Sequence, residues 1–140
     1  MKKFKFNLEK ILQLRKFKEE ECKIALGQAI SVLNKIENEI KQTAIRRHAA
    51  ASQRFMNHED INTWELYIKR LDLQAEKLAQ QAAQAEIIVD EKRALYLEAS
   101  KELKTMEKLK EKQQITYRKD MFNLQMAEMD EITSARSFQN

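Results

Sequence analysis

The sequence contains no proline and one glycine, Gly27, in 140 residues. Sheet folds need turns punctuated by Gly or Pro every ~8–12 residues, so folds built on sheets are excluded. Phosphate-binding loops and dinucleotide fingerprints need several glycines to bring backbone N–H groups against phosphate. We therefore expect an all-α chain that binds no nucleotide by these two routes.

Cysteine and histidine are equally scarce. Cys22 has no second cysteine with which to form an internal disulfide. Together with His48 and His58 it also falls short of the four ligands of a usual zinc site. We predict no metal, no cofactor and a reducing compartment.

Long apolar runs are missing as well. The longest stretch without a charged residue, 24–34, has eleven residues, whereas a membrane-spanning helix needs roughly 17. The first residues are basic and lead directly to Glu9 and Lys10, without the apolar core of ~7–15 residues that a signal peptide has. The sequence predicts a cytoplasmic protein.

Helix-favouring residues are what the chain has in abundance. Ala, Glu, Lys, Leu and Arg fill 72 of the 140 positions, close to the ~50% that is typical of long helices and coiled coils. Two runs of residues repeat at alternating spacings of four and three, which predicts a coiled-coil seam. The first run is Leu8, Leu12, Arg15, Glu19, Cys22, Leu26, Ala29, Leu33, Ile36, Ile40 and Thr43. The second is Ile61, Trp64, Ile68, Leu71, Ala75, Leu78, Ala82, Ala85, Val89, Lys92, Tyr96, Ala99, Leu103 and Met106.

Two such runs joined by a short connection fold most readily as an antiparallel hairpin, because a short loop costs little closure entropy. We predict one coiled-coil domain over residues 1–140, with helix one at about 7–51, a hinge at about 52–60 and helix two at about 61–135. Within the first run, Arg15 and Glu19 interrupt the apolar seam. They either fix the register or mark a place where the coil opens to admit another protein.

The predicted hairpin leaves a C-terminal helical overhang. With its apex near residue 55, residue 8 would lie opposite roughly residue 102, so helix two beyond about Met106 would have no partner. An apolar stripe without a partner indicates a binding surface, and methionine suits contacts that adapt in shape. Tyr117, Met121 and Leu124 form one stripe, and Phe122, Met126 and Met129 form the neighbouring one.

Charge is unevenly placed along the chain. The net charge is +4, but residues 1–18 hold seven bases and one acid, and residues 120–131 hold four acids and no base. Such patches steer association with a charged protein surface. No stripe of one sign dominates, so we do not expect a nucleic-acid partner. A two-helix protein also offers no dry pocket for catalytic carboxylates, which predicts a protein that is not an enzyme.

Two sequence patterns resemble the FliJ family of the bacterial flagellar type III export apparatus. The first is F-x-F-x-L-x-x-x-L-x-L-R over residues 4–15, followed by Glu19-Glu20 and by Leu26-x-x-Ala29. The second begins with Glu91-Lys92-Arg93 and Ala99 and continues through E-K-L-K-E-K at 107–112. It ends with Tyr117, Met129-Asp130-Glu131-Ile132 and Arg136.

The resemblance implies an antiparallel coiled coil similar to the central stalk of rotary ATPases. It implies binding to the hexamer of the export ATPase FliI, with promotion of hexamer assembly and activity. It further implies contact with the export gate protein FlhA, handling of export chaperones, and a peripheral location on the cytoplasmic face of the inner membrane at the flagellar base.

Matching positions give the expected contact residues. Those for the ATPase are Lys3, Lys5, Arg15, Glu107, Lys110, Tyr117, Met129, Asp130 and Arg136. Those for the export gate, exposed apolar residues beside the hinge, are Ile45, Phe55, Met56 and Tyr67. Two alternatives stay open: a structural coiled-coil scaffold or cargo chaperone without ATPase regulation, and a basic helical protein that binds nucleic acid.

Overall fold

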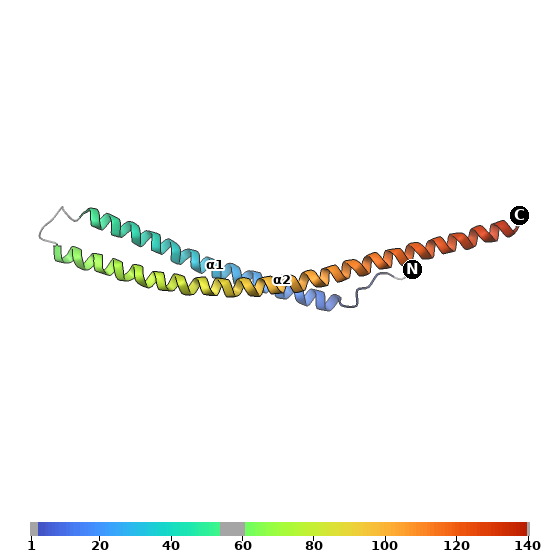
Figure 1. The fold of residues 1–140 in the computed structure, drawn as a ribbon, viewed down its shortest axis with the longest axis horizontal. Coiled ribbons are helices and arrows are strands. Elements are labelled where there is room, and N and C mark those ends of the chain that lie inside the picture. The colour runs from blue at the N-terminus through green and yellow to red at the C-terminus, as the bar shows by residue number, and fades with distance from the viewer. Residues whose placement is uncertain (1–2, 54–60, 140) are drawn as a thin grey trace. The chain divides into compact units, whose positions relative to one another are not determined.

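The computed structural model describes residues 3–53 and 61–139, which form two long helices and no strand. Helix α1 spans Glu9–Ser52 and helix α2 spans Ile61–Gln139 (Figure 1). The prediction of an all-α helical hairpin is confirmed. Helix α2 continues beyond the predicted end near residue 135, because no glycine or proline interrupts the sequence there.

The chain divides into two compact units, to each of which both helices contribute. The terminal unit consists of Met1–Glu19 with Ala99–Asn140, and the central unit is Glu20–Glu98. The assignment of the whole chain to a single coiled-coil domain stays a prediction.

In the central unit the two helices run antiparallel. The Arg47 guanidinium Nε donates to Asp72 Oδ1 at 2.6 Å, and the Trp64 indole Nε1 donates to the Ala50 carbonyl oxygen at 2.7 Å. As the residue number rises along α1, the number of its partner on α2 falls. The Ala50 carbonyl, in the last turn of α1, thus accepts hydrogen bonds from both the Trp64 indole N–H and the Gln53 backbone N–H, the latter at 3.2 Å.

The predicted seam matches the burial pattern. Every position of the first run is buried or half-buried, and so is every position of the second run except Ile61, which is 44% exposed. Even Lys92 is half-buried. A seam in which buried positions alternate by three and four residues is the packing of a coiled coil.

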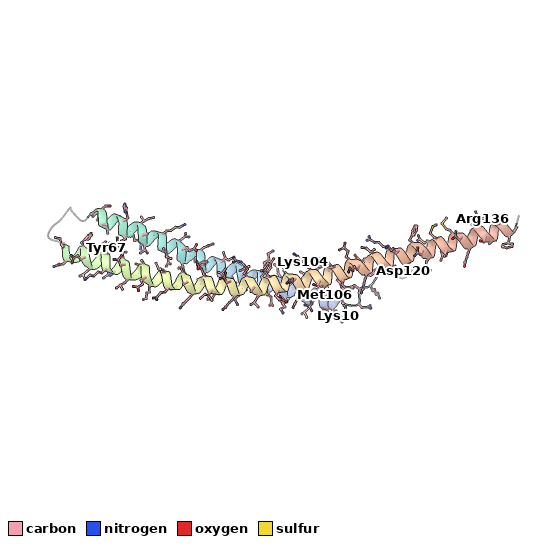
Figure 2. All side chains as sticks on the ribbon, viewed as in Figure 1. Lys10, Tyr67, Lys104, Met106, Asp120 and Arg136 are labelled. Carbon is pink, nitrogen blue, oxygen red and sulfur yellow. The ribbon has the colours of Figure 1, made fainter. Side chains whose placement is uncertain are left out.

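In the terminal unit a small apolar cluster holds the chain's first residues and both helices together. Phe6, Leu12 and Met106, the last labelled in Figure 2, are its buried members, and Phe4, Leu8 and Leu103 pack against it. Leu12 is 1% exposed, the lowest value among the hydrophobic residues of the core.

The expected register is wrong by about one heptad. Lys110 pairs with Glu9 and Glu102 pairs with Arg15, so residue 8 lies opposite the region of residue 109 instead of residue 102. A slip of seven residues keeps apolar positions facing apolar positions, so the periodicity alone permits either register. The helix that lacks a partner therefore begins later than Met106.

Leu12 and Leu14 allow a direct test of this packing. Both are leucines on α1, but Leu12 is 1% exposed and Leu14 is 67% exposed. Leu12→Ala is expected to lower the free energy of unfolding by about 2–5 kcal/mol, because it leaves a cavity in the cluster. Leu14→Ala is expected to change it by less than about 0.5 kcal/mol. Urea unfolding followed by circular dichroism measures both, and equal losses would contradict the described core.

Candidate protein-binding site

The segment that precedes α1 lies against α2. The Phe4 and Tyr117 rings have centroids 5.5 Å apart at an angle of 53°, a separation at which aromatic pairs attract. The Glu9 N–H donates to the Phe6 carbonyl oxygen at 3.1 Å and so closes the turn into α1. Tyr117 was expected on a stripe without a partner, and that expectation is wrong because Phe4 covers it.

Two ion pairs join the helices of the terminal unit. Arg15 Nη1 lies 2.6 Å from Glu102 Oε2, and Lys110 Nζ lies 3.0 Å from Glu9 Oε2. The hydrogen bond from Lys110, helped by one from the Gln13 amide, lowers the pKa of the Glu9 carboxyl below its ordinary value of 4.5. These pairs specify which turn of α1 faces which turn of α2.

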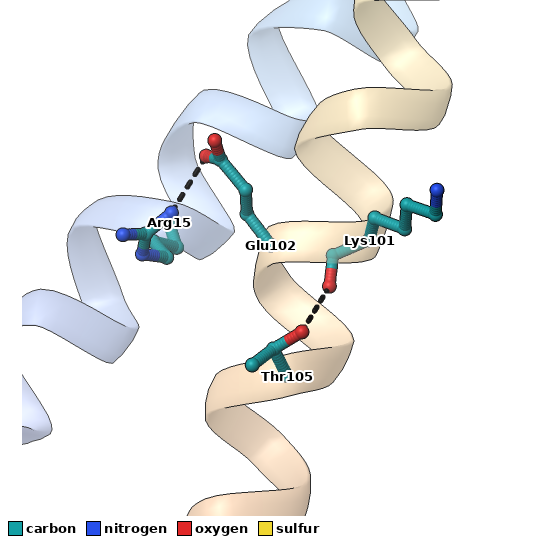
Figure 3. A network of polar contacts seen from close by, with 4 residues as sticks. All are labelled: Arg15, Lys101, Glu102 and Thr105. Carbon is teal, nitrogen blue, oxygen red and sulfur yellow. Dashed lines mark hydrogen bonds and ion pairs between the residues drawn. The ribbon is translucent and has the colours of Figure 1, made fainter.

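Arg15 is the polar interruption of the seam. Its side chain is 35% exposed and points toward Glu102, as Figure 3 shows. Its Nε atom is buried and has no hydrogen-bond partner. A charge half-buried against one specific carboxylate favours a single alignment of the helices. This geometry favours the register-fixing interpretation of the seam break over an opening of the coil.

The nine predicted ATPase-contact residues fall into two groups. Arg15, Lys110 and Tyr117 have partners within the terminal unit. The other six are exposed: Lys3, Lys5, Glu107, Met129, Asp130 and Arg136. The contacts of all nine with an ATPase stay predictions.

Beyond Tyr117 helix α2 continues in the terminal unit with Met121 half-buried and its later large apolar side chains exposed. We call residues 120–138 the C-terminal segment. Phe122 is 61% exposed, Met126 45% and Met129 62%, and Ile132 lies one turn farther on. The helical spacing of the first three side chains places them on one face. Asp120 and Arg136, labelled in Figure 2, lie within this segment.

A row of lysines on α2 escaped the sequence analysis. Exposed lysines recur at intervals of three, four, four and seven residues, which places them on one face of the helix, opposite Met106. We call Lys101, Lys104, Lys108, Lys112 and Lys119 the lysine row. Charge counted along contiguous residues does not reveal this row, because its members come together only on one face of the helix.

Two of the predicted export-gate residues lie in the described part of the central unit. Ile45 is 68% exposed on α1, and Tyr67 is 42% exposed on α2 (Figure 2). Phe55 and Met56 lie outside the described residues. The role of these four residues stays a prediction.

Comparison with protein families matches residues 4–140 to the family described as Flagellar FliJ protein. The chain belongs to the FliJ family. The resemblance drawn from the two sequence patterns is thereby confirmed. No curated protein and no solved structure gives a significant match.

Membership in this family makes the chain a component of flagellar protein export and flagellum biogenesis. Among residues 3–53 and 61–139, no three His, Cys, Asp or Glu side chains gather as they would around a metal ion. Neither of the helices in the described part has the apolar length needed to cross a membrane.

The lowered pKa of Glu9 predicts a pH-dependent contribution to stability. A carboxyl whose pKa is depressed on folding stabilises the protein above its ordinary pKa, and the effect is lost as the pH falls through the folded-state value. Glu9→Gln should therefore lower the urea midpoint at neutral pH, and its difference from the unsubstituted chain should shrink below about pH 4.5. Lys110→Gln should lower the urea midpoint with the same pH dependence. The double substitution should lower it little further, because either change alone already breaks the pair. A Glu9→Gln effect that is equal at neutral and acid pH would contradict the pair.

Proposed function

We propose that the chain binds the export ATPase FliI in the manner of a central stalk, with its terminal unit as the contact. In this proposal it promotes hexamer assembly and ATP hydrolysis without catalysing a reaction itself. It also links the ATPase to the export gate protein FlhA and handles export chaperones. These partners are the ones that the family resemblance implies.

The observation that carries the proposal is the uncovered apolar face of the C-terminal segment. Phe122, Met126 and Met129 are each at least 45% exposed, and side chains of this size rarely stay in water together unless a partner covers them. Acidic residues accompany them at Asp120, Glu128, Asp130 and Glu131. An apolar helix face with carboxylates beside it fits an apolar partner surface that carries basic groups.

A stalk could affect hydrolysis only through unequal contacts. One helical protein at the centre of a sixfold ring meets the six subunits differently, so it favours some of their conformations over others. A ligand shifts such an equilibrium only by its difference in affinity between the states. The scaffold alternative has no such difference, and it predicts binding without any change in the rate of hydrolysis.

Two versions of the terminal unit test the ATPase contact. A chain that ends at Lys119 keeps the Phe4–Tyr117 and Phe6–Leu12–Met106 contacts but lacks the C-terminal segment. A full-length Phe122→Ala, Met129→Ala variant removes two exposed side chains. Both should raise the concentration needed for half-maximal stimulation of FliI by about tenfold or more, since buried interface anchors contribute roughly 1–2 kcal/mol each.

The matched control is Ile87→Ala, Leu97→Ala, which removes side chains of similar exposure, 59% and 58%, from the central part of the same helix. It should leave stimulation unchanged. ATP hydrolysis and hexamer formation by light scattering are the readouts. Stimulation that survives both terminal changes would overturn the proposed contact, and binding by the unsubstituted chain without stimulation would replace the proposal with the scaffold.

The export-gate contact is tested separately in the central unit. Ile45→Ser and Tyr67→Ser each place a polar group at an exposed apolar position. Both are expected to weaken binding to the soluble part of FlhA by about tenfold together, with ATPase stimulation unchanged. Measurement by titration calorimetry decides this, and unaltered FlhA affinity would remove these residues from the proposed contact.

A further inference from the structure

One part of the terminal unit, residues 3–19 and 99–119, is far more basic than the chain as a whole. These residues hold thirteen bases and five acids. Of these bases, Arg15 and Lys110 are engaged by Glu102 and Glu9. The excess positive charge is therefore concentrated on the outer surface of this unit.

On α2 this charge is arranged as a straight line. The lysine row runs from Lys101 to Lys119, about 27 Å at 1.5 Å per residue, and all its members are exposed. Ile115, which is 46% exposed, lies within the row between Lys112 and Lys119. Glu111 lies seven residues after Lys104 and so shares this face, with Glu107 at its edge, but the five lysines outnumber them.

We propose that the lysine row binds the headgroups of an anionic lipid bilayer directly. A straight row on a helix can lie along a flat surface with every ammonium group facing it. The phosphates of a nucleic-acid duplex instead wind around an axis and would meet only part of such a row. The row also contains no arginine, the residue that suits bidentate phosphate or base contacts, and no aromatic side chain for stacking on bases.

The side chains suit the chemistry of the membrane surface. Lysine carries a compact charge on a flexible stem, so it can reach diffuse anionic charge without a fixed geometry. Basic residues near an anionic leaflet each add to binding, and the attraction fades with salt. Ile115 can enter the boundary between headgroups and acyl chains, as apolar residues of surface-bound helices do.

The row is followed by the apolar residues of the C-terminal segment on the same helical face, since Lys119, Phe122 and Met126 are spaced by three and four. The two surfaces consist of different residues, and the inference does not depend on FliI. It assigns to the chain a membrane contact of its own, in addition to any contact made through an export-gate protein.

Vesicle co-sedimentation tests the inference with the full-length chain. Vesicles of phosphatidylglycerol and phosphatidylethanolamine should bind the chain, phosphatidylcholine vesicles should not, and raising the salt should release it. A triple variant should lower the vesicle partition coefficient by about tenfold or more; it combines Lys104→Gln, Lys108→Gln and Lys112→Gln. Glutamine has nearly the same helix propensity as lysine. Circular dichroism checks that the helix content is retained.

The matched control is Lys23→Gln, Lys35→Gln, Lys41→Gln, which removes the same charge from exposed positions of the central unit. It should retain most of the vesicle binding. Equal losses in the two triple variants would show that only net charge matters and would overturn the row as a site. Absence of vesicle binding, or stronger binding to duplex DNA or polyglutamate than to the anionic vesicles at equal salt, would overturn the lipid assignment.

Discussion

The seam between α1 and α2 is the constraint on which the rest of the structure depends. A helix in water gains little from its own backbone, so most of its stability comes from the apolar face that it buries. Here that face is one narrow stripe on each helix, repeated every three and four residues. Where α1 supplies a partner, this stripe of α2 is covered.

A seam of this kind does not select one alignment by itself. Apolar residues face apolar residues again after each slip of seven, so groups outside the repeat have to choose among the alignments. In the terminal unit Arg15 is such a group, because its guanidinium needs Glu102 and a slip would leave a half-buried charge without its carboxylate. Phe4 on Tyr117 and Phe6 on Met106 add contacts that exist in one alignment only.

The periodic part of this structure could be predicted from the sequence, whereas the contacts that follow no repeat could not. The helices, the seam positions and the helical hairpin follow from spacing and from the near absence of glycine and proline. The register did not follow, because it rests on the pair of Arg15 with Glu102, and no local pattern marks Glu102 as a partner. For the same reason Tyr117 was placed on the uncovered stripe, although Phe4, more than a hundred residues earlier, lies against it.

The candidate surfaces differ in how visible they are in the sequence. The apolar residues of the C-terminal segment stand out because large side chains cluster there. The lysine row is hidden because its members stand three, four or seven residues apart, so only a count by helical face brings them together. Along α2 the helix thus passes from a lysine-rich face over 101–119 to an acidic, apolar segment over 120–131. A single partner surface of one charge cannot satisfy both stretches, so the terminal unit is built either for two partners or for one whose charge changes sign along the contact.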